Sequence, residues 1–378
     1  MIARRLGSIL VPCGLFALAA MAAACKTSAS EPSAGGDVVA SPYDFSAFEQ
    51  ELFGGAASTE GAVIQVDGKV VYEKYAAGYD GAKRHLAYSV SKSVGSALLG
   101  IAVDQKLLAL EDSICKWVPA PESADPAYCE TTIGSLVQMT SGLKWDETYE
   151  NPTVSNVLPM LYGNESDMGM YVAHRPRVAT TGTRWSYSSG DSNLLARALR
   201  TALGGKDMRA WATEHLFAPD GLSSAIFESD RSGTLIFSSG VFMTPRDMAR
   251  FGQLYLDDGL AGTTRVLPAT WVTFTKTPAP AVAVPTLHKS DALSERGGSY
   301  GASFWLNAAT RDAPIETLLY PTAPRDTFCA QGQWGQRICM VPSRKLVIVR
   351  VGNDRQGFYN LGPAIGAAVT AIDNGSQK

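Results

Sequence analysis

The sequence predicts an α/β fold of the α+β type, in which one sheet is assembled from distant parts of the chain. Strand-like patterns occupy residues 62–76 and return near residue 328, whereas residues from about 110 to 235 are rich in helix starts, turns and loops. Strands at both ends with helices between them indicate a sheet with a helical insertion subdomain. A small-molecule site is then expected between the sheet and the insertion, where clefts commonly form.

The first predicted elements are a helix, a hairpin and a second helix. Residues 43–53 (YDFSAFEQELF) have helical apolar spacing, and two apolar runs within residues 62–76 flank Asp67-Gly68. This dipeptide favours a tight hairpin turn. From Ser89 the apolar residues recur with a period of 3.6 up to residue 110, which predicts a long apolar helix with Ser89 near its N-terminus.

The last predicted elements return the chain to the sheet. Residues 346–349 form the continuous apolar run expected of a central strand, and residues 361–373 (LGPAIGAAVTAID) predict a closing helix. We therefore expect one folded domain over residues 45–374.

Composition and charge exclude several classes of protein. The 378 residues can bury a large core, and with 46% hydrophobic and 18% charged residues the chain is not a collagen, a coiled coil or a disordered protein over most of its length. The net charge of −3 and the sequence pI near 5.9 do not indicate a nucleic-acid partner, which generally requires a basic stripe.

Residues 1–24 are predicted to be a bacterial export signal. Arg4-Arg5 precede an apolar run from residue 6 to residue 24 that ends in three alanines. The alternative is a membrane-spanning helix, but the run is short, contains Pro12 and Gly14, and lacks a basic stop.

Cys25 follows the three alanines and resembles the lipidated cysteine of a lipoprotein signal. Such signals prefer leucine where Ala22 stands, so simple secretion is the alternative. Residues 25–44 form a Ser/Ala/Gly/Pro-rich stretch that predicts a flexible tether. We expect an exported protein, either periplasmic or attached to the outer membrane through Cys25.

Four cysteines remain after Cys13 is lost with the signal and Cys25 is capped. They permit three pairings, of which Cys115–Cys129 and Cys329–Cys339 are the simplest because each closes a short loop. An oxidising compartment favours disulfides, and four buried free thiols are the alternative.

Several kinds of site are excluded by missing motifs. The chain has no G-x-S-x-G pentapeptide, no zinc-type C-x-x-C, no P-loop and no dinucleotide fingerprint. None of the four histidines (His85, His174, His215 and His288) stands in a metal spacing such as H-E-x-x-H. We expect neither a metal nor an organic cofactor.

Ser89 and Lys92 are the candidate nucleophile and base. A lysine three residues after a serine on a helix projects onto the same face, and an apolar helix lowers the pKa of a lysine that must be neutral to accept a proton. A second pair, Ser113 and Lys116, has the same spacing, but it follows that helix in a charged, proline-rich turn. The surroundings therefore favour Ser89 and Lys92.

An ordered set of motifs resembles the serine β-lactamase and penicillin-binding-protein superfamily. The motifs are Ser89-x-x-Lys92, Tyr187-Ser188-Ser189 and Gln333-Trp334-Gly335. Longer stretches, including MTSGLKWDETY, WSYSSGDSNLL and MTPRDMARFGQLYLDDG, resemble the branch that contains class C β-lactamases, bacterial esterases and 6-aminohexanoate-dimer hydrolases. The likeness to the last of these is strongest, and the match runs from about residue 45 to 372.

The resemblance implies a β-lactamase/transpeptidase-like fold, with an antiparallel sheet flanked by the N- and C-terminal helices. It implies that Ser89 is acylated, that Lys92 deprotonates it, and that Tyr187 passes the proton to the leaving group and later activates water. Backbone N–H groups of Ser89 and Gln336 would form the oxyanion hole.

The departures from the family pattern concern substrate choice. Gln333 stands where β-lactamases and penicillin-binding proteins have a lysine, so no cation is present there to hold a substrate carboxylate. Trp334 is expected either to narrow the cleft or to stack on an apolar substrate, next to Gly335, and Ser189 replaces the common asparagine. These residues favour a serine hydrolase acting on a small ester or amide, with a D,D-peptidase or β-lactamase-type cell-wall enzyme and a catalytically silent binding protein as alternatives.

Overall fold

The computed structural model describes residues 41–55, 57–283, 298–355 and 359–375. The predicted export signal, Cys25 and most of the predicted tether lie outside these ranges, as does His288.

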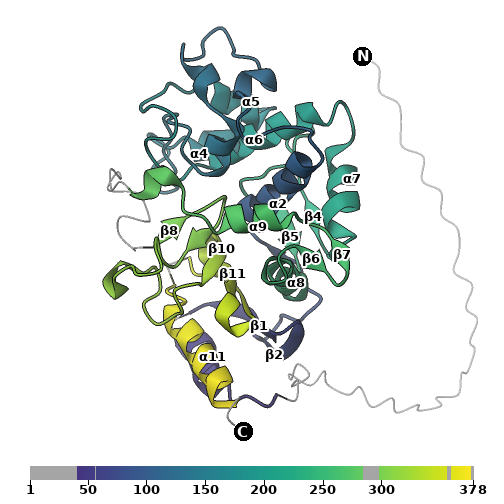
Figure 1. Ribbon diagram of the computed structural model, residues 1–378, viewed down its shortest axis with the longest axis vertical. Coiled ribbons are helices and arrows are strands. Elements are labelled where there is room, and N and C mark those ends of the chain that lie inside the picture. Colours follow the sequence, from purple (N-terminus) through teal and green to yellow (C-terminus); the bar gives the residue numbers. More distant parts are fainter. Residues whose placement is uncertain (1–40, 56, 284–297, 356–358, 376–378) are drawn as a thin grey trace, which may run out of the picture. The chain divides into compact units, whose positions relative to one another are not determined.

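The main sheet has seven strands in the order β2-β1-β12-β11-β10-β9-β8, and every neighbouring pair is antiparallel. Its strands come from both ends of the folded chain, which confirms the predicted fold class (Figure 1). They are β1 (Thr59–Val66), β2 (Lys69–Tyr75), β8 (Ser299–Tyr300), β9 (Trp305–Leu306), β10 (Phe328–Gly332), β11 (Gln336–Val341) and β12 (Leu346–Gly352). The predicted hairpin is also confirmed, because Asp67 and Gly68 between β1 and β2 have φ of 47° and 77°, as a two-residue primed turn requires.

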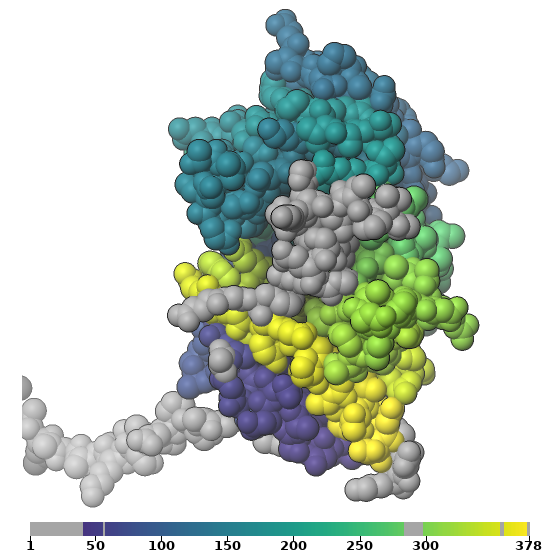
Figure 2. Space-filling model, turned by 90° about the vertical axis from the view of Figure 1, so that its left-hand side faces the viewer, coloured from purple at the N-terminus to yellow at the C-terminus, as the bar shows by residue number. Residues whose placement is uncertain are grey.

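Alternating strand residues bury both faces of the sheet. Ala62 and Ile64 of β1, with Ile348 of β12, belong to the core beneath α1 (Ser46–Phe53) and α11 (Gly362–Gly375). These two helices, from opposite ends of the chain, lie side by side in Figures 1 and 2. The closing helix is thereby confirmed, and β12 needs a continuous apolar run because both of its faces are covered.

The opposite face packs against α2 (Val90–Asp104) and α8 (Pro245–Leu256), using Val63, Val347 and Val349. A Cβ atom at Gly252 of α8 would lie only 2.6 Å from the Val347 side chain. Glycine at this position therefore allows α8 to approach the sheet.

Helices dominate the chain between β3 (His85–Leu86) and β8, including residues 110–235, where the sequence predicts a helical insertion. The α-helices here, besides α2 and α8, are α3 (Ile133–Val137), α4 (Val157–Tyr162), α5 (Met168–Ala173), α6 (Ser189–Ala202), α7 (Met208–Ala212) and α9 (Ala269–Thr275). Two small sheets interrupt them, one ordered β3-β5-β4 with β4 (Ile226–Phe227) and β5 (Val241–Met243), the other pairing β6 (Leu260–Ala261) with β7 (Thr264–Arg265). Short 3-10 or π turns lie at Ile114–Lys116, Tyr128–Glu130, Thr213–Phe217, Pro280–Ala283, Ile315–Thr317, Gln333–Gly335 and Pro342–Arg344.

Helix α2 is shorter than the sequence predicts. Its apolar pattern continues to residue 110, but the helix ends at Asp104 because Lys106 adopts φ of 57°. The N–H groups of Lys106 and Leu107 then close the end on the carbonyls of Val103 and Ala102, both at 2.9 Å. Leu108 remains buried after the turn, so the later apolar residues serve the core without extending the helix.

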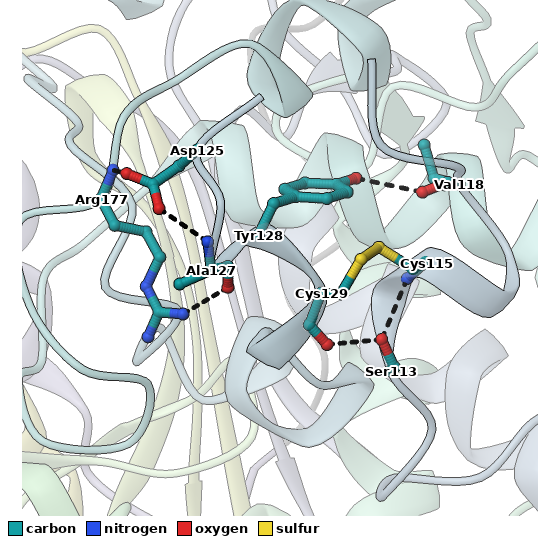
Figure 3. The surroundings of a disulfide bond; sticks show 8 residues. All are labelled: Ser113, Cys115, Val118, Asp125, Ala127, Tyr128, Cys129 and Arg177. Carbon is teal, nitrogen blue, oxygen red and sulfur yellow. Dashed lines mark hydrogen bonds between the residues drawn. A yellow bond between two sulfur atoms is a disulfide. The ribbon is translucent and has the colours of Figure 1, made fainter. Parts of the chain in front are cut away.

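Both local cysteine pairings are confirmed. Cys115 and Cys129 join two short turns, and the Ser113 hydroxyl accepts from the Cys115 N–H at 3.2 Å and donates to the Cys129 carbonyl at 2.5 Å (Figure 3). Cys329 and Cys339 face each other across β10 and β11, with Cα atoms 4.2 Å apart. Each bridge fixes a loop whose ends the fold already brings together.

None of the helices in the described part of the chain is long and apolar enough to cross a membrane.

Candidate active site

The Lys92 amine lies at the centre of the candidate site, and its side chain is almost fully buried. Ser89 is the N-cap residue of α2, so Lys92 lies one turn into the helix on the same face. The Lys92 Nζ atom is 3.0 Å from Ser89 Oγ, 3.0 Å from Ser189 Oγ and 2.9 Å from the Ser238 carbonyl oxygen. Three separate segments thus supply the polar partners of one buried amine.

Burial lowers the pKa of Lys92 from 10.5 to about 8, and the negative charge of Glu147 opposes part of this effect. A lysine with this pKa is partly neutral near pH 7 to 8. Lys92 can therefore accept the Ser89 proton across the 3.0 Å contact.

The Ser113/Lys116 pair has no such environment. Ser113 caps a short turn, and the exposed Lys116 side chain forms an ion pair with Asp112 at 2.8 Å. A solvated, paired ammonium is a poor proton acceptor, which separates this pair from Ser89 and Lys92.

Tyr187 completes the group around the nucleophile. Its hydroxyl is in hydrogen-bonding contact with Ser89, and Lys92 Nζ lies 4.9 Å from the centre of its ring. Burial raises the pKa of Tyr187, as does the charge of Glu147. Tyr187 is therefore a neutral phenol at physiological pH, and Lys92 is the group here that can act as a base.

Ser189 lies where α6 begins and links Lys92 to a carboxylate. Its hydroxyl donates to Glu147 Oε1 at 2.5 Å and accepts from Lys92 at 3.0 Å. Glu147 Oε2 also accepts the Ser189 backbone N–H at 2.8 Å. The structure thus brings Ser189 into the hydrogen-bond network of the amine.

Glu147 is a candidate site residue that sequence reasoning missed. It also accepts from Trp145 Nε1 at 2.5 Å and from the Tyr149 hydroxyl at 3.1 Å. The segment WDETY carried part of the family resemblance, but no pattern in it pointed to Glu147. The one available signal was an acidic residue within a stretch that resembled known enzymes.

The glycine-containing motif lies in a turn between two strands of the main sheet. Gln333–Gly335 connects β10 to β11, where Trp334 and Gly335 have φ of 57° and 93°. A Cβ atom at Gly335 would lie 1.9 Å from Nη1 of Arg350. This position therefore requires glycine both for its backbone conformation and for space.

A fully buried arginine holds this turn. Arg350 donates to the Gly335 carbonyl at 3.1 Å and pairs with Asp354 at 2.6 Å, while the Asp354 N–H donates to the Trp334 carbonyl at 3.1 Å. These contacts fix the turn from the side of the sheet.

The predicted oxyanion residues lie on neighbouring segments. Gln336 is the first residue of β11, and a Cβ atom on Gly332 beside it would lie 2.2 Å from the carbonyl of Ala87, two residues before Ser89. Tyr88 packs edge-on against Trp334 with ring centres 5.0 Å apart, and its φ of 48° is rare for a bulky residue. The turn and the start of α2 are therefore in direct contact.

A cavity of about 170 Å³ opens beside Ser89. Most of its lining side chains are apolar or aromatic: Leu86, Tyr88, Tyr149, Leu161, Tyr162, Met168 and Ile236. The other lining residues are Ser89, Glu228, Ser239, Gly240 and Gln333, of which Glu228 is the carboxylate. Trp334 packs between Tyr88 and Arg355, whose guanidinium lies 4.2 Å from its ring centre. Of the residues predicted to bind substrate, Gln333 lines the cavity, whereas Ser189, Trp334 and Gly335 are not among the residues that line it.

A metal centre finds no support in the described ranges, where no cluster of three His, Cys, Asp or Glu residues occurs. His85 contacts Glu60 at 3.0 Å, His174 contacts Ser123 at 2.6 Å, and His215 contacts the Trp211 carbonyl at 3.0 Å. These three histidines thus have protein partners away from Lys92.

A sequence model described as Beta-lactamase matches residues 45–370. The chain belongs to the Beta-lactamase family. This confirms the resemblance read from the motifs. The superfamily consists of serine hydrolases that include esterases, amidohydrolases and penicillin-binding-protein-like proteins.

Individual relatives of this Beta-lactamase family member are distant. The 6-aminohexanoate-dimer hydrolase of Paenarthrobacter ureafaciens is 25% identical over 222 residues, which are 57% of this chain and 56% of that protein. The chain thus matches only about half the length of this curated relative.

Two solved structures share the fold. A family VIII carboxylesterase has a TM-score of 0.67 at 14% identity, covering 88% of this chain and 98% of the other. A penicillin-binding-protein homologue from Caulobacter crescentus has a TM-score of 0.65 at 16% identity, with the same coverage of 88% and 98%. They confirm the β-lactamase/transpeptidase-like fold.

The depressed pKa of Lys92 in this Beta-lactamase family member predicts a specific pH dependence of stability. Between about pH 8 and 10.5 the folded protein binds fewer protons at Lys92 than the unfolded chain, so its stability rises with pH across this window. Lys92→Met has no such group. Its free energy of unfolding, relative to the parent, should therefore fall by about 3 kcal/mol from pH 8 to 10.5, as measured by urea unfolding.

Lys69→Met, which replaces an exposed lysine of β2, is the control for the substitution itself. A pH-independent difference between Lys92→Met and the parent would contradict the shifted pKa.

Proposed function

We propose that the protein is an exported serine hydrolase that cleaves an ester or amide bond through a covalent acyl-Ser89 intermediate. The observation that carries this proposal is the 3.0 Å contact between the Ser89 hydroxyl and a buried lysine whose pKa is about 8. A serine becomes a nucleophile when an adjacent neutral base accepts its proton.

The proposed reaction assigns one step to each group. Neutral Lys92 takes the Ser89 proton as Oγ bonds to the substrate carbonyl carbon, and the N–H groups of Ser89 and Gln336 bind the oxyanion that forms. Tyr187 gives its proton to the departing alcohol or amine and regains one from Lys92. In the second half of the reaction Lys92, acting through Tyr187, takes a proton from the water that attacks the acyl carbon and returns it to the departing Ser89 Oγ, so that Ser89 and a carboxylic acid are released.

Similarity to named relatives supports the reaction class. As their names state, one relative hydrolyses the dimer of an amino acid, 6-aminohexanoate, and a structural neighbour is a carboxylesterase. Cleavage of an amide bond and of an ester bond would proceed through the same acyl-serine intermediate. We therefore include both bond types in the proposal.

Labelling with a fluorophosphonate probe tests the nucleophile. The parent protein should gain one phosphonyl adduct by intact mass, and Ser89→Ala should gain none, because the probe reacts with activated serine hydroxyls. Ser113→Ala is the matched control, taken from the Ser113/Lys116 pair of the same spacing, and should be labelled like the parent.

A folded parent protein that acquires no adduct would contradict the proposal and favour the catalytically silent binding protein. An adduct that survives in Ser89→Ala would place the nucleophile elsewhere.

The cavity predicts which acyl groups are accepted. The residues that line it include one carboxylate, Glu228, which is exposed, and no lysine or arginine, and Gln333 brings no positive charge. A neutral p-nitrophenyl butyrate should therefore be a better substrate than the anionic p-nitrophenyl hemiglutarate. A charge repulsion of 1 to 2 kcal/mol corresponds to roughly tenfold or more in kcat/KM.

Glu228→Gln should bring the kcat/KM values of the two esters closer together, because it should raise kcat/KM for the anionic ester and change that for the neutral ester little. Faster turnover of the anionic ester by the parent, or of nitrocefin and a D-Ala-D-Ala peptide alone, would instead favour the cell-wall alternative.

Export is part of the proposal because of residues 1–25 and the two disulfides. A charged and apolar leader ends in alanines before Cys25, and disulfides persist mainly in oxidising compartments. In a bacterial host, the full chain should fractionate with membranes, and Cys25→Ala should move to the soluble periplasmic fraction. A soluble periplasmic parent would indicate simple secretion, and a cytoplasmic parent would contradict export.

A further inference from the structure

We propose that Glu147 is a positioning residue which, through the Ser189 hydroxyl, keeps the Lys92 amine turned toward Ser89 and sets the pH at which that amine becomes a base. This inference rests on the proposed function, because it assigns a role within the same reaction. Glu147 itself lies two hydrogen bonds away from the Lys92 amine and three away from Ser89.

The hydrogen bonds available to the neutral amine support the first part of the proposal, the orientation of Lys92 toward Ser89. A neutral lysine has two N–H groups and one lone pair. The Ser238 carbonyl at 2.9 Å can only accept, so it takes one N–H. If the Ser189 hydroxyl accepts the second N–H at 3.0 Å, the lone pair is left for the Ser89 proton.

Glu147 decides whether Ser189 accepts or donates. A hydroxyl has a single proton, and Glu147 Oε1 receives that proton at 2.5 Å. Without the carboxylate, Ser189 could rotate and donate to the Lys92 lone pair, in competition with Ser89. The carboxylate thus keeps the base available to the nucleophile.

The charge of Glu147 supports the second part of the proposal, the effect on the pH at which Lys92 becomes a base. Burial lowers the pKa of Lys92, and Glu147 is the group whose charge raises it again. The other titratable groups around this carboxylate are Tyr187, Asp191 of α6, Tyr149, Tyr300 of β8 and Arg337 of β11, which acts on Tyr187. Burial raises the pKa of each of these tyrosines, so they stay neutral near pH 7. Burial also raises the pKa of Asp191, whose carboxyl accepts from Ser141 at 2.9 Å, to about 7, but Glu147 is the carboxylate whose charge acts on the Lys92 amine.

A purely structural role is the alternative. Glu147 also binds Trp145 Nε1, the Tyr149 hydroxyl and the Ser189 N–H, contacts that could simply hold the loop against α6. Loss of activity alone would not separate the two roles. The test therefore measures a pH profile.

The experiment follows the rate of fluorophosphonate labelling of Ser89 from pH 5 to 10 in the parent protein, Glu147→Gln and Glu228→Gln. In the plot of labelling rate against pH, the rise on the acid side (the acid limb) reports the loss of the proton from Lys92. Removing the carboxylate charge should shift that limb by about one unit to lower pH in Glu147→Gln. The plateau rate should fall about tenfold, because the new amide can donate to Ser189 and turn its proton toward Lys92.

Glu228→Gln is the matched control, since it removes the same charge from a residue of the cavity beside Ser89 that has no hydrogen-bond link to Lys92. Its acid limb should stay in place. Glu147→Asp should also keep the parental limb, because it retains the charge, while its shorter reach lowers the plateau.

Should Glu147→Gln fail to fold, Ser189→Ala and Ser189→Thr test the same link. Ser189→Ala should lower the plateau rate about tenfold, and Ser189→Thr, which keeps the hydroxyl, should restore most of it.

The outcomes distinguish this inference from the proposed function. Labelling of folded Glu147→Gln with an unmoved acid limb overturns the role of Glu147 and leaves Ser89 as the nucleophile. If the variant does not fold, equal rates in the two Ser189 variants overturn it. A parent protein that is not labelled at any pH overturns both.

Discussion

The burial of one amine is the constraint on which the site depends. A buried ammonium without hydrogen-bond partners would be strongly destabilising, and Lys92 obtains its partners from the start of α2, the start of α6 and the segment before β5. The last of these is fixed in turn by Asn193 of α6, which accepts the Ser238 N–H at 3.0 Å. The helical region and the sheet-facing helix α2 therefore meet at the Lys92 amine, which couples the assembly of the fold to the chemistry of Ser89.

Backbone strain lies on the opposite side of the nucleophile. Tyr88 and Trp334 both adopt positive φ, and their rings contact each other between the start of α2 and the turn after β10. Such conformations persist where the surroundings determine them. Here the surroundings are Arg350, which is fully buried and binds both Gly335 and Asp354, and the Cys329–Cys339 bridge between the strands that carry the turn. The rigid sheet thus supports the segment that presents Gln336.

The sequence predicted the features that arise from local patterns. The Asp67-Gly68 hairpin, the buried strand β12 and the closing helix α11 each follow from adjacent residues, and the short-loop disulfides follow from spacing. The end of α2 was misplaced because a left-handed Lys106 stops the helix while the apolar pattern continues. The geometry of the turn at residues 333–335 could not be predicted because the buried Arg350, which contacts it from another strand, holds it, and a local pattern does not show that contact. Glu147 was missed because its contact with Ser189 spans 42 positions and exists only in the fold.

Ser189 shows why this long-range contact matters to the chemistry. An asparagine at this position would carry separate donor and acceptor atoms, so its carbonyl could face the lysine while its amide group bound elsewhere. A serine has one hydroxyl for both roles, and its direction is undetermined until a second group takes the proton. Glu147 is that group here, and its carboxylate adds a negative charge near the amine. A serine in place of the asparagine of the motif can therefore accept from the lysine reliably only if a carboxylate from another segment takes the serine proton. The departure from the family pattern and the residue that the sequence did not reveal are two parts of one arrangement.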